Sequence, residues 1–91
     1  MKAFEWIDRV KKHAGIDSDY GAAKLLGITK QAISTYRRKQ STLDEEAAIK
    51  VANALNIQAA GIILDQAAEH VKSDEIRTTL QEQARRLCIL C

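Results

Sequence analysis

The chain lacks proline and is poor in aromatic residues. No proline and only four glycines occur among its 91 residues, so little interrupts the chain except at helix ends, and this favours an all-α fold. Aromatic side chains make up only 4% of the sequence, so the core has to be built mostly from Ala, Ile, Leu and Val. Such a core is thin in so short a chain, and a partner subunit would add burial.

Cysteine is scarce, and nothing in the sequence suggests export or a membrane. The longest apolar run near the C-terminus, residues 87–91, is far too short to cross a bilayer. The N-terminus shows no signal peptide, so we expect a reducing, cytoplasmic location. Cys88 and Cys91 form a C-x-x-C pair, but no second pair accompanies them, and His13 and His70 lack ligand-like spacing. We interpret both cysteines as small apolar side chains near a frayed helix end, and we expect no metal site.

Signatures of catalysis are also missing. The sequence has no glycine-rich phosphate loop and no recognisable arrangement of a Ser, Cys or His nucleophile. Glu45 and Glu46 are adjacent carboxylates, but a role at a helix start explains them better than catalysis. We expect neither enzymatic activity nor a cofactor.

The most informative segment is residues 22–39, AAKLLGITKQAISTYRRK, which predicts a helix, a three-residue turn and a second helix. Gly27 can adopt the left-handed conformation that ends a helix, and Thr29 is a good N-cap for the next helix. Because so short a turn makes the two helices cross steeply, the second helix is turned outward, where it can enter a major groove of DNA. The segment therefore predicts a helix-turn-helix and sequence-specific DNA binding.

Positive charge is concentrated on this segment. The formal net charge is only +2, yet residues 20–43 contain no acidic residue. Basic residues at a helix end could simply be solvated and stabilised by the helix dipole. An acid-free segment that also carries polar residues after the turn favours a phosphate-binding surface instead. Its five basic residues are Lys24, Lys30, Arg37, Arg38 and Lys39.

Apolar residues at helical spacing predict further helices before and after this pair. The first helix ends at Gly15, and Ser18 is the predicted N-cap of the second. For the fourth helix, Thr42 and Glu45 form a capping-box pattern, with Asp44 as a rival N-cap. The predicted apolar faces are Phe4, Ile7, Val10 and Ala14 in the first helix, Ile33 and Tyr36 in the third, Ala48, Val51, Ala52 and Leu55 in the fourth, and Ala60, Ile63, Leu64, Ala67 and Val71 in the fifth, with Trp6 packed beside the first.

A narrow apolar stripe marks a last helix, for which Ser73 is the predicted N-cap. The members of the stripe recur at steps of four, four, three and four, which is typical of a seam where two helices pair. We therefore divide the chain into a DNA-binding domain, residues 1–72, and a C-terminal amphipathic helix, residues 73–91. That helix either forms a dimer contact or packs on its own domain. The stripe consists of Ile76, Leu80, Ala84 and Leu87, our candidate dimer interface, followed by Cys91.

The span from about residue 18 to residue 65 resembles the lambda-repressor-like helix-turn-helix domains of phage Cro and CI repressors. The resemblance rests on AKLLGITKQAISxYRR and on LDxExAxxxAxxL, which begins at Leu43. It implies an all-α domain of five helices, here with a C-terminal helix in addition. It also implies a dimeric phage or prophage regulator, acting at the nucleoid of a bacterial host cell, that represses transcription by occupying a near-palindromic operator.

The resemblance further implies which residues contact DNA, because the family reads base edges with the residues just after the turn. A glutamine can pair with adenine, and a lysine can donate to guanine. Two positions depart from the family: Lys39 stands where many relatives have Gly, and Asp19 stands where many have a phosphate-binding Gln, so that role is not transferred. The implied base-reading residues are Lys30, Gln31, Ser34 and Thr35, and the implied phosphate-binding residues are Thr29, Arg37, Arg38, Lys39 and Gln40.

Two other functions stay open at this point. The same domain could serve an antitoxin-like or excision-control factor that works with a partner protein. A helical protein–protein adaptor could instead use the basic surface to meet an acidic partner. The sequence predicts neither the operator nor the target genes, and it indicates no small-molecule substrate.

Overall fold

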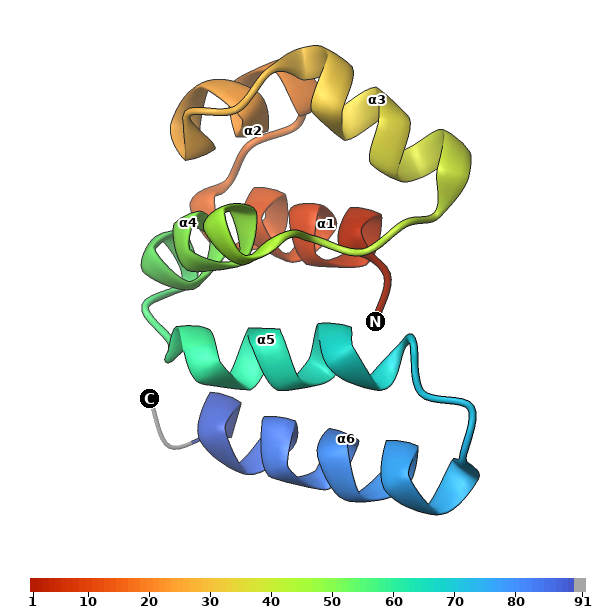
Figure 1. Ribbon diagram of the computed structural model, residues 1–91. Coiled ribbons are helices and arrows are strands. Elements are labelled where there is room, and N and C mark those ends of the chain that lie inside the picture. The colour runs from red at the N-terminus through yellow and green to blue at the C-terminus, as the bar shows by residue number, and fades with distance from the viewer. Residues whose placement is uncertain (90–91) are drawn as a thin grey trace.

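The computed structural model describes the backbone of residues 1–89 and the side chains of residues 1–87. This part of the chain folds into six α-helices without strands, which confirms the all-α expectation (Figure 1). None of these helices is both long and apolar enough to cross a membrane. The helices are α1 (Ala3–Ala14), α2 (Asp19–Leu26), α3 (Lys30–Lys39), α4 (Glu45–Leu55), α5 (Ala59–Ala68) and α6 (Asp74–Ile89).

The predicted caps at the end of α1, at both ends of α2 and at the start of α3 are confirmed. Gly15 and Gly27 both have a φ of 69°, the left-handed region that a residue with a Cβ enters only at a cost. After Gly27, the Ile28 N–H donates to the carbonyl of Ala23 at 3.0 Å, which closes the C-terminus of α2. The hydroxyls of Ser18 and Thr29 accept from backbone N–H groups three residues later, each at 3.0 Å. The turn between α2 and α3 is thus specified by local chemistry.

The hydrogen bonds at the start of α4 show which of the two predicted N-caps is used. The Asp44 carboxylate accepts from the Ala47 N–H at 2.7 Å and is the N-cap. The capping box expected at Thr42 is wrong, because Thr42 lies two residues too early, and its hydroxyl instead meets His70 Nε2 at 2.9 Å.

The core lies between α1 and α4, with α2 and α3 on one side and α5 and α6 on the other (Figure 1). Trp6 is packed as expected, and its ring Nε1–H donates to Asp65 Oδ2 at 3.1 Å. The predicted face of α1 is wrong at Phe4, which is half-buried, and at Ala14, which is exposed at the helix end. The fully buried larger side chains are Trp6, Ile7, Val10, Ile33, Val51 and Ile62.

The predicted apolar face of α5 is largely wrong. The buried residues of this helix are Gly61, Ile62, Gln66 and Ala68, whereas Ile63 is 38% exposed. The four buried residues share one face of the helix, nearly opposite the predicted one, because the polar Gln66 is buried through hydrogen bonds to the Leu43 N–H and the Met1 carbonyl oxygen. Of the other predicted positions, Ala60 and Ala67 are exposed, and Leu64 and Val71 are half-buried.

The last helix folds back along α5 and runs antiparallel to it (Figure 1). Part of its apolar stripe packs within the chain and part does not: Ala84 is 3% exposed, whereas Ile76 is 54% exposed. The backbone of Cys88 lies in α6, but its side chain and all of Cys91 fall outside the described residues.

Candidate nucleic-acid interface

Helix α3 has one buried face and one polar face. Ile33 is fully buried, and Tyr36 packs against the same core, as predicted. At 100° per residue, Gln31, Ser34, Thr35 and Arg38 fall within an arc of about 100° on the opposite side, with Lys30 at its edge. We call Lys30, Gln31, Ser34, Thr35 and Arg38 the recognition face; all but the half-buried Thr35 are exposed.

The turn before α3 places hydrogen-bond donors beside this face. Thr29 is exposed, and its hydroxyl oxygen accepts the capping bond from Ala32. The hydroxyl hydrogen is therefore left to donate to an outside acceptor such as a phosphate oxygen. The N–H groups of the first helical turn, at Lys30 and Gln31, have no partner inside the helix, and together with the helix dipole they favour an anion.

The turn is also fastened from behind by α4. Lys50 Nζ donates to the carbonyl oxygen of Gly27 at 3.2 Å. This contact neutralises part of the negative end of α2 and ties the turn to the core helix. The start of α3 therefore has a fixed place relative to α4.

Helices α2 and α3 carry four basic side chains that are not ion-paired to any residue the structure describes. Lys24, Lys30, Arg38 and Lys39 are exposed, and none has an ion-pair partner within the described part of the chain. Helix α3 ends at Lys39, and its C-cap Gln40 is exposed and has a φ of 50°.

Arg37, unlike these basic residues, is ion-paired within the chain. Its Nε and Nη2 donate to the two carboxylate oxygens of Asp19 at 2.7 and 2.6 Å, and Nη2 also meets Asp8 Oδ1 at 2.7 Å. Lys11 Nζ contributes a further contact to Asp19 at 3.1 Å. This Arg37 cluster (Asp8, Lys11, Asp19 and Arg37) joins α1, α2 and α3 and balances two positive charges with two negative ones.

The Arg37 cluster shifts the ionisation of its members. Hydrogen bonds from Arg37, supported by Lys11, lower the pKa of Asp19 to about 2, although burial opposes the shift. The hydrogen bonds that Arg37 donates to Asp19 and Asp8 raise the pKa of Arg37. A carboxylate at this position would by itself repel a phosphate; here it is neutralised and serves to hold α3 instead.

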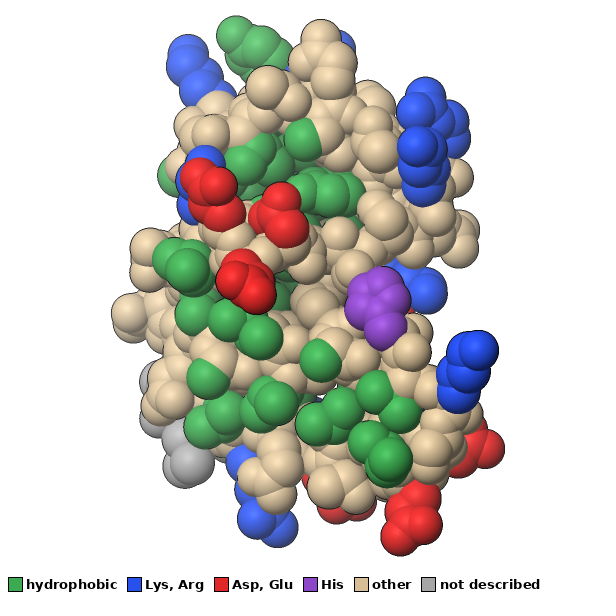
Figure 2. All heavy atoms as spheres, in the orientation of Figure 1, with side chains coloured by type: hydrophobic (Ala, Val, Ile, Leu, Met, Phe, Trp, Pro, Cys, Tyr) green, Lys and Arg blue, Asp and Glu red, His purple; other side chains and the backbone are tan. Residues whose placement is uncertain are grey.

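Three acidic residues at the start of α4 lie on the side of α3 that faces away from the recognition face. Asp44, Glu45 and Glu46, which we call the acidic wall, are all exposed (Figure 2). Burial, with a smaller contribution from the charge of Asp44, raises the pKa of the nearby Tyr36 hydroxyl. The like charges of the acidic wall disfavour an anionic ligand on that side of α3.

Local patterns did not reveal the Arg37 cluster. The sequence singled out Asp19 only as a departure from the resembled family, and its partner Arg37 lies 18 residues away. The sequence also gave no role to Tyr20, which is 61% exposed on α2. Among the described residues, no group of three or more His, Cys, Asp and Glu side chains could hold a metal ion.

Comparison with known proteins identifies the segment that carries this face. Residues 18–62 match the family model described as Helix-turn-helix. The uncharacterized protein Gp-c of Pseudoalteromonas phage PM2 is similar to the chain, with 41% identity over 49 residues, or 54% of this chain. The match covers 53% of Gp-c, so it spans about half the length of that curated relative. No solved structure matches the chain.

Proposed function

We propose that the chain is a transcriptional regulator that reads a DNA operator with α3, since residues 18–62 match the helix-turn-helix family model and resemble lambda-repressor-like domains of the Cro/CI type. The observation that carries the proposal is the division of α3 into two faces. Ile33 is fully buried, and the opposite face presents the exposed side chains of Gln31 and Ser34. A helix held in this way can enter the major groove without unpacking the core.

In the proposed complex, the recognition face reads base edges. Gln31 has the paired acceptor and donor that match adenine N7 and N6, and Lys30 can donate to guanine O6 or N7. Ser34 and Thr35 can each bond to a base edge or to the backbone beside it.

Phosphates on either side of the groove fix the register of the helix. The Thr29 hydroxyl and the N–H groups of the first turn of α3 would bind one strand. Arg38, Lys39 and Gln40 would bind phosphates at the other end of the helix. We leave Arg37 out of this set, because its guanidinium is already bound to Asp8 and Asp19.

We propose further that two copies bind together and block transcription at the operator. Two recognition helices about 34 Å apart would match successive major grooves of a near-palindromic site. Of the α6 stripe, Ile76 is the most exposed apolar residue and is our candidate contact. Ala84 is buried within its own chain and is left out of the proposed contact.

Selection of bound duplexes from a random pool, with and without Gln31→Ala, tests this function. The wild-type chain should enrich one motif with twofold symmetry, which gives the half-site spacing directly. Gln31→Ala should lose about 1–3 kcal/mol of discrimination at one position in each half-site. Thr78→Ala, at an exposed polar residue on the side of α6 away from the apolar stripe, is the control and should leave the motif unchanged. Salt-sensitive binding without any enriched sequence would contradict the proposal.

A further inference from the structure

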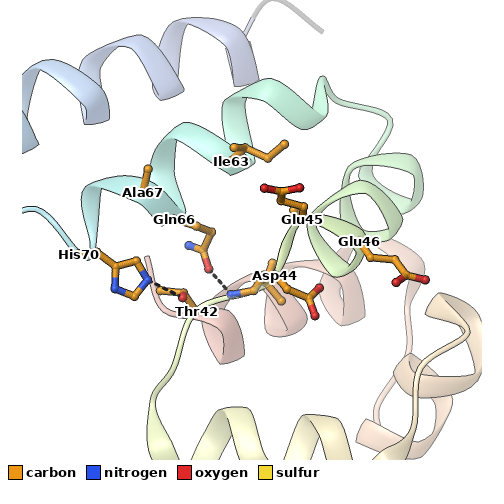
Figure 3. A pocket seen from close by; sticks show the side chains of 10 residues that line it. Thr42, Asp44, Glu45, Glu46, Ile63, Gln66, Ala67 and His70 are labelled. Atoms are coloured by element: carbon orange, nitrogen blue, oxygen red, sulfur yellow. Dashed lines mark hydrogen bonds between the residues drawn. The ribbon is translucent and has the colours of Figure 1, made fainter.

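A groove lies between the first turns of α4 and the C-terminal half of α5, away from the recognition face. It encloses about 530 Å³. Ile63 and Ala67 of α5 and Ala48 of α4 supply apolar lining, and Thr42 and His70 stand at one end (Figure 3). Ile63 is 38% exposed, so part of its side chain is open to an occupant of the groove.

The buried polar side chain in the lining, Gln66, already has hydrogen-bond partners within the chain. Gln66 is 5% exposed, and its Oε1 accepts from the Leu43 N–H at 2.7 Å. Its Nε2 donates to the Met1 carbonyl oxygen at 2.6 Å and to Asp65 Oδ2 at 3.0 Å. The amide therefore holds the α3–α4 connection to α5, and an occupant of the groove would meet mainly apolar surface there.

The acidic wall forms one side of this groove. Asp44 uses one oxygen as the cap of α4. Glu46 is 82% exposed, and its Oε1 lies 3.8 Å from Lys50 Nζ. An ion pair this exposed contributes little to stability. Glu45 has no ion-pair partner among the residues that the structure describes. Figure 2 shows these acidic side chains over α4, with hydrophobic side chains over α5 and α6 below them.

We propose that this groove binds a cationic amphipathic helix of a partner protein. Two packed helices form a trough that fits the apolar side chains of a third helix at i, i+3, i+4 and i+7. Lys or Arg on the same segment would lie against the acidic wall, which supplies charge complementarity.

A second copy of the chain fits this groove poorly. A twofold contact brings the same patch of both copies together, and it would therefore place one acidic wall near the other. Within the lining, His70 is the one basic side chain available to offset three carboxylates. The groove also adjoins the α3–α4 connection, so a bound helix would lie beside the end of α3 and leave the recognition face open.

Titration of the ¹⁵N-labelled chain with a synthetic helical peptide tests the proposal. The probe is a peptide of about four turns with Leu at i, i+3, i+4 and i+7 and Lys elsewhere, and its counterpart carries Glu in place of Lys. The Lys peptide should shift amide resonances along α4 and α5 around Ala48, Ile63 and Ala67. It should bind at least about tenfold more tightly than the Glu peptide.

Matched variants separate the groove from general acidity. The double variant Glu45→Gln/Glu46→Gln should weaken the Lys peptide about tenfold. Asp74→Asn/Glu75→Gln changes the same net charge in the first turn of α6 and should leave affinity within about twofold, since exposed charges act locally. Ile63→Asp places a charge in the apolar lining and should weaken the peptide by at least about tenfold.

Three results would overturn the proposal. The first is equal loss of affinity in both double variants, and the second is a set of shifts centred on α3. The third is a concentration-dependent dimer in sedimentation that Ile63→Asp dissociates without peptide, since a second copy would then fill the groove. If Ile63→Asp does not fold, the peptide affinities of the two double variants, which are altered only at exposed side chains, decide whether the peptide binds at the groove.

Discussion

The α2–α3 pair and the α5–α6 pair lie on opposite sides of the same core, and they are held to it by different means. Helix α5 buries four residues between its neighbours, while α3 buries only Ile33. What α3 lacks in apolar contact is supplied by the Arg37 cluster at its end and by the bond from Lys50 at its start. A helix that presents most of its circumference to an outside partner can bury only a narrow stripe. Polar contacts must then fix its position.

The largest expected effect follows from the single buried residue of α3. Ile33→Ala should lower the free energy of unfolding by about 2–5 kcal/mol, because it leaves a cavity under a helix with little other apolar contact. Ile63→Ala, at a residue 38% exposed on α5, should cost less than about 1 kcal/mol. Urea denaturation followed by circular dichroism measures both. Similar losses for the two variants would contradict the contrast between the helices.

A smaller effect is expected from the ion pairs that replace apolar contact. Arg37→Met keeps the length of the side chain but leaves the carboxylates of Asp8 and Asp19 without their partner, and should cost about 1–3 kcal/mol of stability. The neighbouring Arg38→Met removes an exposed charge without a partner and should stay within about 0.5 kcal/mol. The same urea titration compares them. If Arg37→Met is as stable as Arg38→Met, then packing alone positions α3.

The sequence predicted the helices of this fold well where the signals are local. The glycines after α1 and α2 and the capping hydroxyls before α2 and α3 act within a few residues, so their spacing alone locates the turn. The buried face of α5 was missed because it includes Gln66, whose burial depends on hydrogen bonds to Leu43 and Met1, 23 and 65 residues away. The apolar pattern therefore favoured Ile63, which is partly exposed, instead of Ile62, which is fully buried.

The candidate site was predictable in its centre and less so at its edge. Residues just after the turn point outward in any helix-turn-helix, so the sequence alone singled out Gln31 and Ser34. The role of Arg37 depends on carboxylates 18 and 29 residues away. A run of three basic residues gives no indication of which one turns inward.

The Arg37 cluster also predicts that the stability of the chain depends on pH. Asp19 has a pKa of about 2 in the folded chain against an ordinary 3.8. A lowered pKa means that its stabilisation is present above about pH 4 and is lost as the pH falls toward 2. The full shift corresponds to roughly 2 kcal/mol, and partial exposure of the pair reduces this to about 1 kcal/mol.

Comparison of the wild-type chain with Asp19→Asn separates the stabilisation from Asp19 from that of the other carboxylates. The difference in unfolding free energy should be about 1 kcal/mol near pH 6 and should close toward pH 2. Asp17→Asn, at an exposed residue just before α2, should differ from wild type by less than about 0.5 kcal/mol throughout. A gap for Asp19→Asn that does not change with pH would show that the ion pair contributes nothing.

The smallest effect concerns DNA affinity and separates the two neighbouring arginines most sharply. Arg38→Ala should weaken binding to all sequences alike and reduce the slope of log K against log salt by about 0.9, the value for one phosphate contact. Arg86→Ala, at an exposed arginine of α6, makes the same change in net charge and should leave the slope unaltered. Arg37→Ala should also leave it nearly unaltered, because its charge is balanced within the Arg37 cluster. Mobility-shift titrations at several salt concentrations measure all three. An equal slope change for Arg37→Ala and Arg38→Ala would mean that Arg37 releases its carboxylates to reach DNA, and the stabilising and DNA-binding roles would then belong to one residue.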